Sequence, residues 1–478
     1  MSYYTWMASR MLTQLRIQNF KGWKDTGVIR MAPISLFFGA NSSGKSSIGQ
    51  FLMMLKQTVE FSDRQSVFFP GNAHSAVHLG TYKEIVYRQN LESRINFEYE
   101  WELPSQFKFR DAVSDKHYTA CKIKFSATIG AEDDNSRKVY IEQLQYRLLA
   151  STEDYLTIGM ERMGDKKNQY HVNAEQYLLK RNPGRVWHPG APVRFYGFPD
   201  EVVAYYQNAE FVQDLNLYHE TLFKSLFYLG PLRTKTDRLY SWSGITPESV
   251  GYSGENTVAA MLASHGRKIS SGYRKHAKPM EEVIAASLKK MNLIEDFQVR
   301  PISEHRQEYE VKVRAKGSLD WVDLPDVGFG ISQVLPVLVQ CFYAPPGAII
   351  IMEQPEIHLH PSAQSALADV MIDAISSREN GADRNIQLII ETHSEHFLRR
   401  LQRRIAEDNI PQNKVSAYFA NITRAPASLE PLQIDDYGNI RNWPESFFGD
   451  EMDDITQQAR AAMNKRMTQR ANAMEVAE

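Results

Sequence analysis

Gly39-Ala40-Asn41-Ser42-Ser43-Gly44-Lys45-Ser46 is the segment of this 478-residue sequence that says most about its fold. It follows an apolar run at 34–38 and precedes a stretch, 46–58, with apolar residues at helical spacing. The pattern GxxxxGK[ST] between a strand and a helix is typical of a phosphate-binding loop. Its glycines allow successive N–H groups and the helix N-terminus to face phosphate oxygens. The segment therefore predicts a nucleotide-binding α/β domain.

The polar side chains of this loop have distinct predicted roles. Lys45 is expected to bring its charge to the β- and γ-phosphates, and Ser46 is expected to offer its hydroxyl to Mg²⁺. A phosphate loop alone does not identify the nucleotide. The predicted nucleotide-binding residues are Gly39, Asn41, Ser42, Ser43, Gly44, Lys45, Ser46 and Ser47.

Two apolar strand candidates near the other end of the chain finish in polar residues. The run 348–352 leads into Glu353-Gln354-Pro355-Glu356, and the run 387–390 leads into Glu391-Thr392-His393-Ser394. Ligands of parallel sheets bind at the carboxyl ends of the strands. Glu353 is therefore predicted to share Mg²⁺ with Ser46, and His393 is predicted to contact the γ-phosphate.

A second glycine-rich turn lies before an apolar helix, in Asp326-Val-Gly328-Phe-Gly330-Ile-Ser332-Gln333. A turn onto a helix N-terminus suits a second phosphate-binding surface. Gly328, Gly330 and Ser332 are its candidate contacts. Upstream, segments 94–103, 118–129 and 138–149 are rich in Tyr, Phe, Val and Ile and predict an antiparallel β insertion. The strand and helix pattern resumes after it, so the two ends of the chain are expected to share one α/β sheet.

The order of these motifs resembles the ABC-type heads of the SMC, Rad50, RecF and OLD-like ATPases. Residues 15–22 and 37–47 are similar to the first strand and Walker A of that group. EQPEIHLHP at 353–361 is similar to its Walker B and D-loop, and ETHSEH at 391–396 to its histidine switch. The resemblance implies ATP and Mg²⁺ held between two heads, with the glycine-rich turn of one head facing the phosphate loop of the other. A lone head is then expected to hydrolyse ATP poorly.

Two departures from that group affect the expected chemistry. Gly328 stands where the signature turn usually carries a serine, and Gln354 stands where a glutamate commonly serves as the base. An amide can orient water but cannot take its proton. The expected enzyme is therefore a slow ATP hydrolase, with Glu356 or a neighbour as the other candidate base. The predicted catalytic residues are Lys45, Glu353, Gln354, Glu356 and His393.

Three further segments, 228–233, 250–255 and 437–448, resemble standalone prokaryotic ATPases, many of which belong to two-gene phage-defence systems such as Septu and PARIS. This resemblance implies a nucleotide-gated sensor or scaffold that controls a separate effector, a nuclease encoded by an adjacent gene. The implied partners are a second copy of the chain, in a dimer or a higher even-numbered oligomer, and a nucleic acid or phage protein as trigger. The alternative is a RecF-like DNA-repair ATPase that clamps DNA directly. A net charge of -2 and the absence of a heptad run stand against it.

The expected organisation is an ABC-type ATPase head formed by both ends of the chain, with a β and helical insertion. Its predicted parts are residues 1–90 as the N-terminal part of the head, 91–224 as the insertion, 225–319 as a helical and β segment packed on the head, 320–445 as the C-terminal part of the head, and 446–478 as a tail.

Composition bounds the compartment. The two cysteines, Cys121 and Cys341, support neither a disulfide framework nor a cysteine zinc site. The first twenty residues lack the apolar core of a secretory signal. The most apolar window, 334–352, is interrupted by Gln340 and by Pro345-Pro346-Gly347, so it is expected to form a helix, a turn and a buried strand rather than a membrane span. A reducing cytoplasm is expected.

Three other patterns have a plain interpretation. The spacings of His358, His360, His393 and His396 could suggest zinc, but they fall within the D-loop and switch segments. Residues 234–237 match the TKxD pattern of GTPases, although the DxxG match at 435–438 follows in the wrong order. The late Walker B, the histidine switch and the signature-like turn together disfavour a metabolic P-loop kinase or GTPase. The basic run 399–404 could bind nucleic acid, or could be a solvated helix face.

Overall fold

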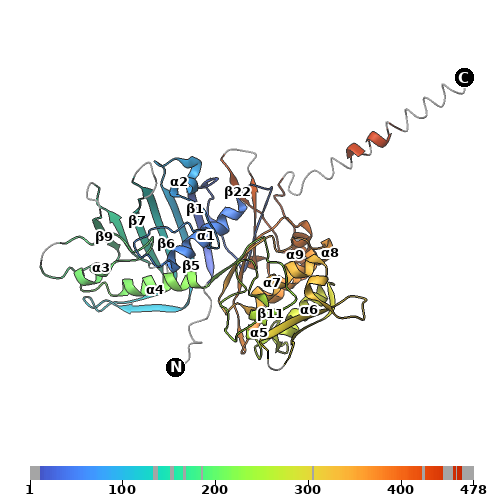
Figure 1. Cartoon of the computed structure of the whole chain (residues 1–478). Coiled ribbons are helices and arrows are strands. Elements are labelled where there is room, and N and C mark those ends of the chain that lie inside the picture. The colour runs from blue at the N-terminus through green and yellow to red at the C-terminus, as the bar shows by residue number, and fades with distance from the viewer. Residues whose placement is uncertain are drawn as a thin grey trace, which may run out of the picture.

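The computed structural model describes residues 11–132, 138–150, 155–164, 168–184, 187–303, 306–421, 426–444, 456–458, 460–463 and 465. Two large sheets dominate this part of the chain, and Figure 1 shows them side by side with helix α1 (Lys45–Glu60) between them. The expected tail at 446–478 and the segment before residue 11 lie mostly outside the described residues.

One sheet has eight strands and is antiparallel throughout. Its order is β2-β1-β5-β6-β7-β8-β9, with β3 paired to β1. The first strand, β1, pairs with β5, so strands from both sides of residue 90 belong to this sheet. Buried and less buried positions alternate along β5 and β6, as expected for strands with one face on a core. The strands are β1 (Leu12–Phe20), β2 (Trp23–Asp25), β3 (Ile29–Arg30), β5 (Ile95–Arg110), β6 (His117–Ala131), β7 (Val139–Leu149), β8 (Tyr155–Arg162) and β9 (Tyr170–Glu175).

The other large sheet has six strands in the order β10-β17-β20-β4-β21-β22. All neighbours are parallel except β22, which runs antiparallel to β21. Strand β4 comes from the N-terminal region and lies between two strands from the C-terminal region, so the two ends of the chain do share one sheet. The strands are β10 (Leu226–Leu229), β17 (Ile349–Glu353), β20 (Gln387–Glu391), β4 (Ile34–Gly39), β21 (Val415–Asn421) and β22 (Ser428–Pro431).

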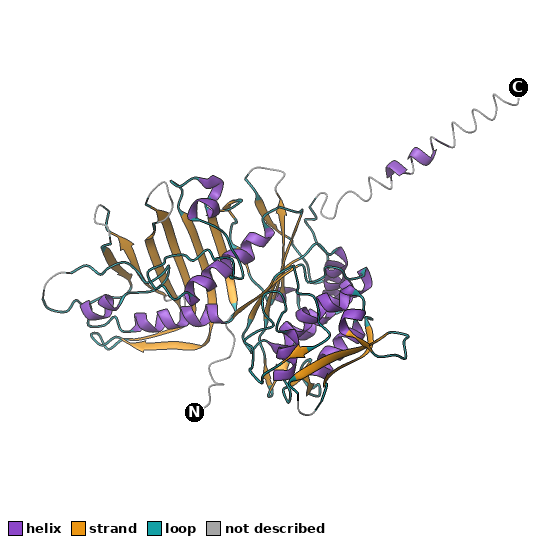
Figure 2. Ribbon diagram, in the orientation of Figure 1, coloured by secondary structure: helices purple, strands orange, loops and turns teal. Residues whose placement is uncertain are grey.

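The six-stranded sheet is covered on both faces, which explains why β17 and β20 are apolar and fully buried along their length. Alternate residues of β17 enter two different cores. Ile349 and Ile351 join α1, α3, α4 and the antiparallel sheet, whereas Ile350 and Met352 join helices α5–α9. Figure 2 shows those helices gathered on one side. The helices are α2 (Tyr82–Ile85), α3 (Asp200–Tyr205), α4 (Phe211–Lys224), α5 (Thr257–Ala263), α6 (Met280–Lys290), α7 (Phe329–Tyr343), α8 (Pro361–Ile375) and α9 (Glu395–Ala406).

The apolar window 334–352 lies in α7, a turn and β17, as the sequence predicts. No helix of the described residues combines the length and apolarity needed to cross a bilayer. The smaller elements are short strands and 3₁₀ turns in several parts of the chain. They are β11 (Tyr240–Ser241), β12 (Lys268–Ser270), β13 (Lys278–Pro279), β14 (Ile294–Pro301), β15 (Glu308–Ala315), β16 (Val322–Asp323), β18 (Arg378–Glu379), β19 (Ala382–Asp383) and the short 3₁₀ turns Tyr87–Gln89, Leu324–Asp326 and Gln412–Lys414.

A buried histidine lies at the centre of the antiparallel half, which is the part of the chain built around the eight-stranded sheet. His219 has no exposed surface and lies between two tyrosine hydroxyls, with Tyr99 Oη 2.7 Å from Nε2 and Tyr146 Oη 2.9 Å from Nδ1. The Tyr146 hydroxyl also donates to the Tyr196 carbonyl, at 3.0 Å. Nδ1 therefore carries the proton and Nε2 accepts from Tyr99. Burial lowers the pKa of His219 well below its ordinary value.

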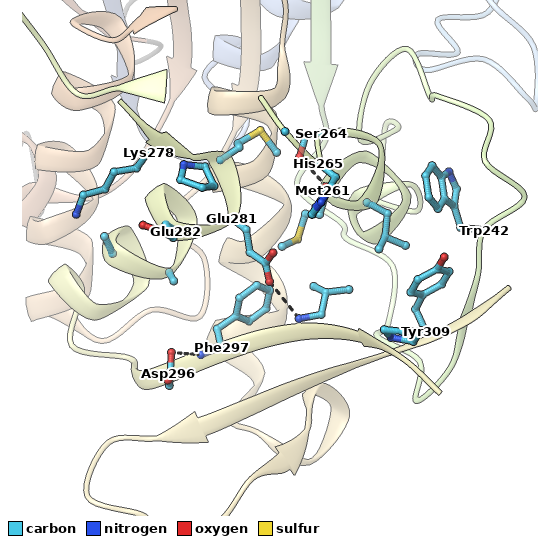
Figure 3. Close-up of a pocket in the computed structure, with 18 of the residues that line it drawn as sticks. Trp242, Met261, Ser264, His265, Lys278, Glu281, Glu282, Asp296, Phe297 and Tyr309 are labelled. Atoms are coloured by element: carbon cyan, nitrogen blue, oxygen red, sulfur yellow. Dashed lines mark hydrogen bonds between the residues drawn. The ribbon is translucent and has the colours of Figure 1, made fainter. Parts of the chain in front are cut away.

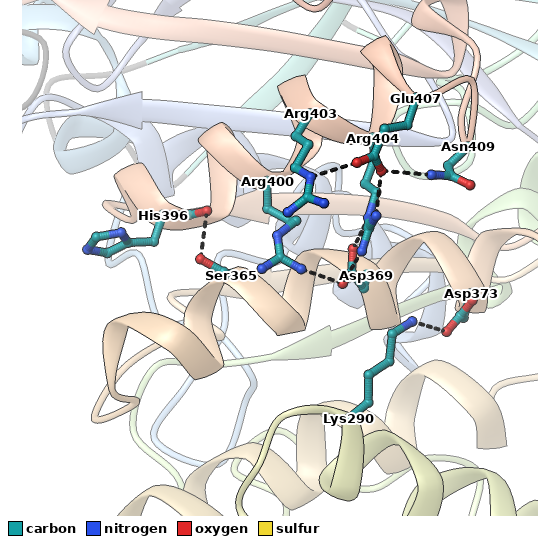
Figure 4. Close-up of polar contacts among 10 residues, drawn as sticks. All are labelled: Lys290, Ser365, Asp369, Asp373, His396, Arg400, Arg403, Arg404, Glu407 and Asn409. Carbon is teal, nitrogen blue, oxygen red and sulfur yellow. Dashed lines mark hydrogen bonds and ion pairs between the residues drawn. The ribbon is translucent and has the colours of Figure 1, made fainter.

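The basic run 399–404 is paired with acids on α8 and α9 (Figure 4). Arg400 and Arg404 both bind Asp369, at 2.8 and 2.6 Å. Arg399 pairs with Glu395 and Arg403 with Glu407, each one turn away. Each positive charge of this run thus has a carboxylate beside it, and Asp369 joins α8 to α9.

Candidate nucleotide-binding site

The phosphate loop joins β4 to α1, and its glycines are required by close contacts. Gly39 has φ +143°, and a Cβ there would lie 2.6 Å from the Ala420 carbonyl oxygen. Gly44 has φ +87°, and a Cβ there would lie 3.2 Å from Nε1 of Trp23. Side chains at these two positions would strain the backbone and displace a neighbouring strand or ring. The loop can therefore keep its shape only with glycine at both ends.

Lys45 turns back into its own loop. Its Nζ donates to the carbonyl oxygens of Gly39, at 2.9 Å, and Ala40, at 2.6 Å. Burial lowers the pKa of Lys45, while the charge of Glu391 opposes that effect. The ammonium group of Lys45 is thus held by carbonyl oxygens of its own loop. A phosphate loop presents N–H donors and positive charge to a nucleotide at this place.

Trp23 supports the loop from β2. Its Nε1 donates to Ser47 Oγ, at 2.8 Å, and to the Gly44 carbonyl, at 3.2 Å. The indole is fully buried beneath the start of α1. Sequence reasoning missed this residue because nothing in the local pattern of β2 indicates that it packs under the phosphate loop. The hydroxyl of Ser47, which was predicted to touch nucleotide, accepts from Trp23 Nε1 and donates to the Gly44 carbonyl.

Two carboxylates meet beside Ser46. Glu353 ends β17, Glu391 ends β20, and the two residues are direct partners in the parallel register. Both, together with Lys45 and Ser46, line a cavity of about 10 Å³. That volume is about the minimum that holds one small bound species. Glu353 was predicted here, whereas Glu391 was quoted only as part of the switch segment, because its neighbour depends on the strand order.

The electrostatics of this cavity favour a bound cation. Burial, followed by the charge of Glu391, raises the pKa of Glu353 to about 7. Burial also raises the pKa of Glu391, against the opposing effects of the Ser46 hydroxyl and Lys45. Oε2 of Glu391 is buried and has no hydrogen-bond partner among the described residues. Two carboxylates and a hydroxyl are the hard oxygen ligands that Mg²⁺ prefers.

Mg²⁺ therefore fits this donor set, with nucleotide oxygens and water completing its shell. Within the part of the chain that the structure describes, no group of three or more His, Cys, Asp or Glu side chains is arranged to hold a metal. Mg²⁺ commonly takes only one or two carboxylates from the protein and the rest from phosphates and water. Glu353, Glu391 and Ser46 would hold it here.

The segment after Glu353 is braced against the switch segment. Gln354 has φ +46°, an unusual backbone angle for a side chain other than glycine, and its N–H donates to the Glu391 carbonyl at 2.8 Å. Glu356 is buried, and its Oε1 accepts the His393 backbone N–H at 2.8 Å. His393 itself is exposed, and partial burial followed by the charge of Lys45 lowers its pKa. The exposed His393 imidazole is therefore close enough to Lys45 for that charge to disfavour its protonated form.

The second glycine-rich turn contacts a different part of the chain. Gly328 precedes α7 with open space around it, and a Cβ at Gly330 would lie 3.0 Å from the His358 carbonyl oxygen. The turn thus packs on the loop after β17. Ser332 is buried and donates to the Phe329 carbonyl at 2.7 Å, whereas Phe329 is 54% exposed. Of the turn, Asp326, Gly328 and Phe329 are the exposed residues.

The other histidines of the two segments have local contacts. The ring of His358 meets Phe329 edge to face, with centroids 4.8 Å apart. His360 caps α8 by accepting the Ser362 N–H. A separate cavity of about 1110 Å³ lies between α5, α6 and the β14–β15 hairpin (Figure 3). None of its lining residues belongs to the phosphate loop or to the acidic strand ends.

Three family models match the chain. Residues 11–182 match "AAA ATPase domain", and residues 209–399 match "AAA domain, putative AbiEii toxin, Type IV TA system". Residues 410–458 match "Protein of unknown function (DUF3696)". The phosphate loop lies in the first match, and the glycine-rich turn and both acidic strand ends lie in the second. A search of curated proteins finds no match.

Among the solved structures that match this chain are three SMC heads, at low identity and low TM-score. The SMC head domain from Thermotoga maritima has a TM-score of 0.36 and 11% identity, over 88% of this chain and 99% of that one. An SMC head bound to the C-terminal winged-helix domain of ScpA has a TM-score of 0.39 and 10% identity, over 89% and 98%. The Pyrococcus furiosus SMC head with an extended coiled coil, bound to the C-terminal domain of ScpA, gives 0.38 and 8%, over 89% and 96%.

The two AAA models divide the site between them, because one contains Lys45 and Ser46 and the other contains Glu353 and Glu391. The sheet brings the two halves together around one small cavity. Residues 11–182 thus match an AAA ATPase model that contains a complete phosphate loop, and residues 209–399 match an AAA model that contains its acidic partners.

Proposed function

We propose that this ATPase binds ATP with Mg²⁺ between paired copies of the chain and acts as the nucleotide-gated sensor or scaffold subunit of a two-component anti-phage system, controlling a separate effector. The observation that carries the ATP and Mg²⁺ part is the meeting of Ser46, Glu353 and Glu391 around one cavity beside Lys45. These are the residue types that phosphoryl-transfer sites use to hold a nucleotide and its metal.

The proposed roles follow the positions of the side chains. Lys45 leaves its loop carbonyls to meet the terminal phosphates, and the loop N–H groups bind the remaining phosphate oxygens. Mg²⁺, when bound, neutralises the charge that develops on those oxygens during hydrolysis. Gln354 orients the attacking water without taking its proton, so turnover is slow. His393 contacts the γ-phosphate from the exposed side of the site.

Pairing of two copies is supported by the turn before α7. The turn packs on the loop after β17 through Phe329 and Gly330, whereas Gly328 has open space around it. A closed two-fold pair would let each turn reach the other copy's nucleotide, and both sites would be completed at once. Gly328 is the proposed contact across the pair, with Gly330 and Ser332 shaping the turn behind it.

A separate effector is supported by the printed description of one matched model, which names a toxin of a type IV toxin–antitoxin system. Such systems have two components. The described residues hold no group of three acidic, histidine or cysteine side chains for a metal-dependent nuclease. In the proposed system, nucleolytic chemistry therefore belongs to a second protein, a nuclease encoded by the adjacent gene.

Mass measurement with and without ATP tests the pairing. We expect the wild-type mass to become an even multiple of the chain mass in ATP, and we expect Lys45→Ala and Phe329→Arg to remain unpaired. Leu178→Arg is the matched control, because Leu178 is also an exposed apolar residue, at 83%, but lies in the antiparallel half. Pairing by Phe329→Arg would place the contact elsewhere.

Co-purification with the product of the adjacent gene tests the partner. We expect the two proteins to elute together, and we expect the mass of the complex to change when ATP is added. A strictly monomeric chain that hydrolyses ATP at full rate and binds no product of an adjacent gene would refute both the pairing and the two-component role.

A further inference from the structure

The segment 228–233 lies beside the acidic end of β17 and donates hydrogen bonds to it. The Tyr228 hydroxyl donates to Oε1 of Glu353 at 2.8 Å. The Arg233 guanidinium donates to two successive carbonyls, those of Glu353 at 3.2 Å and Gln354 at 3.4 Å. Tyr228 and Arg233 are 7% and 8% exposed, so both contacts are shielded from water. One short segment thus holds both the carboxylate and the backbone at this strand end.

The strand register explains how Tyr228 reaches the carboxylate. Strand β10 is the edge strand beside β17, with Tyr228 paired to Ile351 and Leu229 paired to Met352. The ring of Tyr228 can therefore extend along β17 toward Glu353. Arg233 follows after the strand ends, where the chain crosses the carboxyl edge of the sheet. There the β17 backbone leaves the sheet through Gln354 and its unusual φ of +46°.

A second loop fixes this segment on both sides. Gly230 N–H donates to the Tyr252 carbonyl at 2.8 Å, and Thr234 N–H donates to the Ser253 carbonyl at 2.8 Å. The hydroxyls of Thr234 and Ser253 lie 2.6 Å apart. These contacts leave segment 230–234 little freedom to move away from β17.

The same loop is anchored to the helix that follows the glycine-rich turn. Val250 N–H donates to Oε1 of Gln340 in α7, at 3.1 Å. Gly254 has φ +81°, and a Cβ there would lie 2.7 Å from Pro336 in α7. A continuous series of contacts therefore runs from α7 through loop 250–254 and segment 228–234 to Glu353.

We propose that Tyr228 and Arg233 are positioning residues that orient Glu353 and its backbone for the magnesium–nucleotide complex, with loop 250–254 holding them in place against α7. The proposal rests on the function proposed above. Carboxylates that bind metals need neighbours that fix their orientation, and the loss of such a neighbour commonly weakens metal binding. The Tyr228 hydroxyl fills one acceptor oxygen of Glu353 and so restricts how the carboxylate can turn.

The test compares ATP affinity in MgCl₂ with ATP affinity in EDTA, measured by calorimetry on the full chain. In Tyr228→Phe we expect the gain in affinity that Mg²⁺ provides to fall by about 10- to 100-fold, with affinity in EDTA unchanged. Tyr170→Phe is the matched control. Tyr170 is also buried and donates a hydroxyl hydrogen bond, to the Ile141 carbonyl at 2.7 Å, but in the antiparallel sheet. We expect it to lower thermal stability without altering the effect of Mg²⁺.

Arg233→Lys provides the second variant, since lysine keeps the charge but cannot reach two carbonyls in a fork. We expect it to weaken Mg²⁺-dependent binding as well. An effect of Mg²⁺ in Tyr228→Phe equal to that in wild type would overturn the proposal, as would wild-type binding that is indifferent to Mg²⁺. Failure of the wild type to bind ATP in either buffer would refute the proposed function itself.

Discussion

The backbone N–H of His393 donates to Oε1 of Glu356 at 2.8 Å, so the switch segment after β20 is tied to the loop after β17. The carboxylate of Glu356 is buried at this contact, whereas Gln354 is partly exposed. Glu356 is thus placed to hold His393. It is poorly placed to collect a proton from water, and this position favours Gln354 as the residue next to the attacking water.

Gln354→Glu should accelerate ATP hydrolysis. A carboxylate at this position supplies the base that the amide cannot, and a positioned base is worth about 100-fold or more in rate. Steady-state phosphate release from wild type, Gln354→Glu and Glu356→Gln decides between the two candidates. If Gln354→Glu leaves the rate unaltered and Glu356→Gln abolishes it, the base is Glu356.

Lys45→Ala should weaken ATP binding by one to two decades. The variant loses a charge-assisted contact to the terminal phosphates, worth about 1.5 to 3 kcal/mol. Calorimetric titration with ATP provides the measurement, and Lys83→Ala, at an exposed position of α2, is the control for loss of a lysine charge. Unchanged affinity in Lys45→Ala would remove the assignment of this loop to nucleotide binding.

Acid should destabilise the antiparallel half through His219. The pKa of this residue is well below normal in the folded state, because it is buried, and about 6.5 in the unfolded chain. The unfolded state alone takes up the proton as pH falls below about 6.5, so the stability contributed by neutral His219 is present above that pH and is lost below it.

Urea unfolding at several pH values measures this effect. We expect the difference in unfolding free energy between wild type and His219→Gln to shrink by about 1.4 kcal/mol per pH unit below 6. His74→Gln, at an exposed histidine, serves as the control. A difference that does not vary with pH would show that His219 takes up its proton at the same pH in the folded and unfolded states.

Asp369→Ala should separate α8 from α9. Asp369 is 5% exposed and accepts bonds from both Arg400 and Arg404, whose guanidinium groups then lose their shared carboxylate. We expect a loss of about 2 to 3 kcal/mol in the free energy of unfolding. Asp373→Ala, which removes a more exposed pair with Lys290, should cost much less. Equal losses in the two variants would contradict the claim that Asp369 holds α8 and α9 together.

The local patterns predicted most of the site. The phosphate loop is a contiguous motif, and Glu353 and His393 follow runs of apolar residues that could only be buried strands. Glu391 escaped assignment as a metal ligand because its place beside Glu353 depends on β20 lying between β17 and β4, and strand order is a property of the whole sheet. The predicted sharing of one sheet by both chain ends is confirmed by β4.

The contacts that brace the site were beyond sequence reasoning. Trp23 reaches the phosphate loop from β2, and Tyr228 reaches Glu353 across 125 residues of sequence. Nothing in the immediate neighbours of either residue encodes those contacts. The plain interpretation of the basic run as a helix face fits better than its use on nucleic acid, since Arg400 and Arg404 are engaged with Asp369. The pairing acid on α8 could not be identified from α9 alone.

The position of β4 between β20 and β21 has a consequence for how the protein is made. A ribosome releases β4 and the phosphate loop hundreds of residues before either neighbouring strand exists. Until then β4 is an apolar strand with both hydrogen-bonding edges unpaired. Nascent chains in this condition recruit chaperones. The nucleotide site can therefore assemble only after nearly the whole polypeptide has left the exit tunnel.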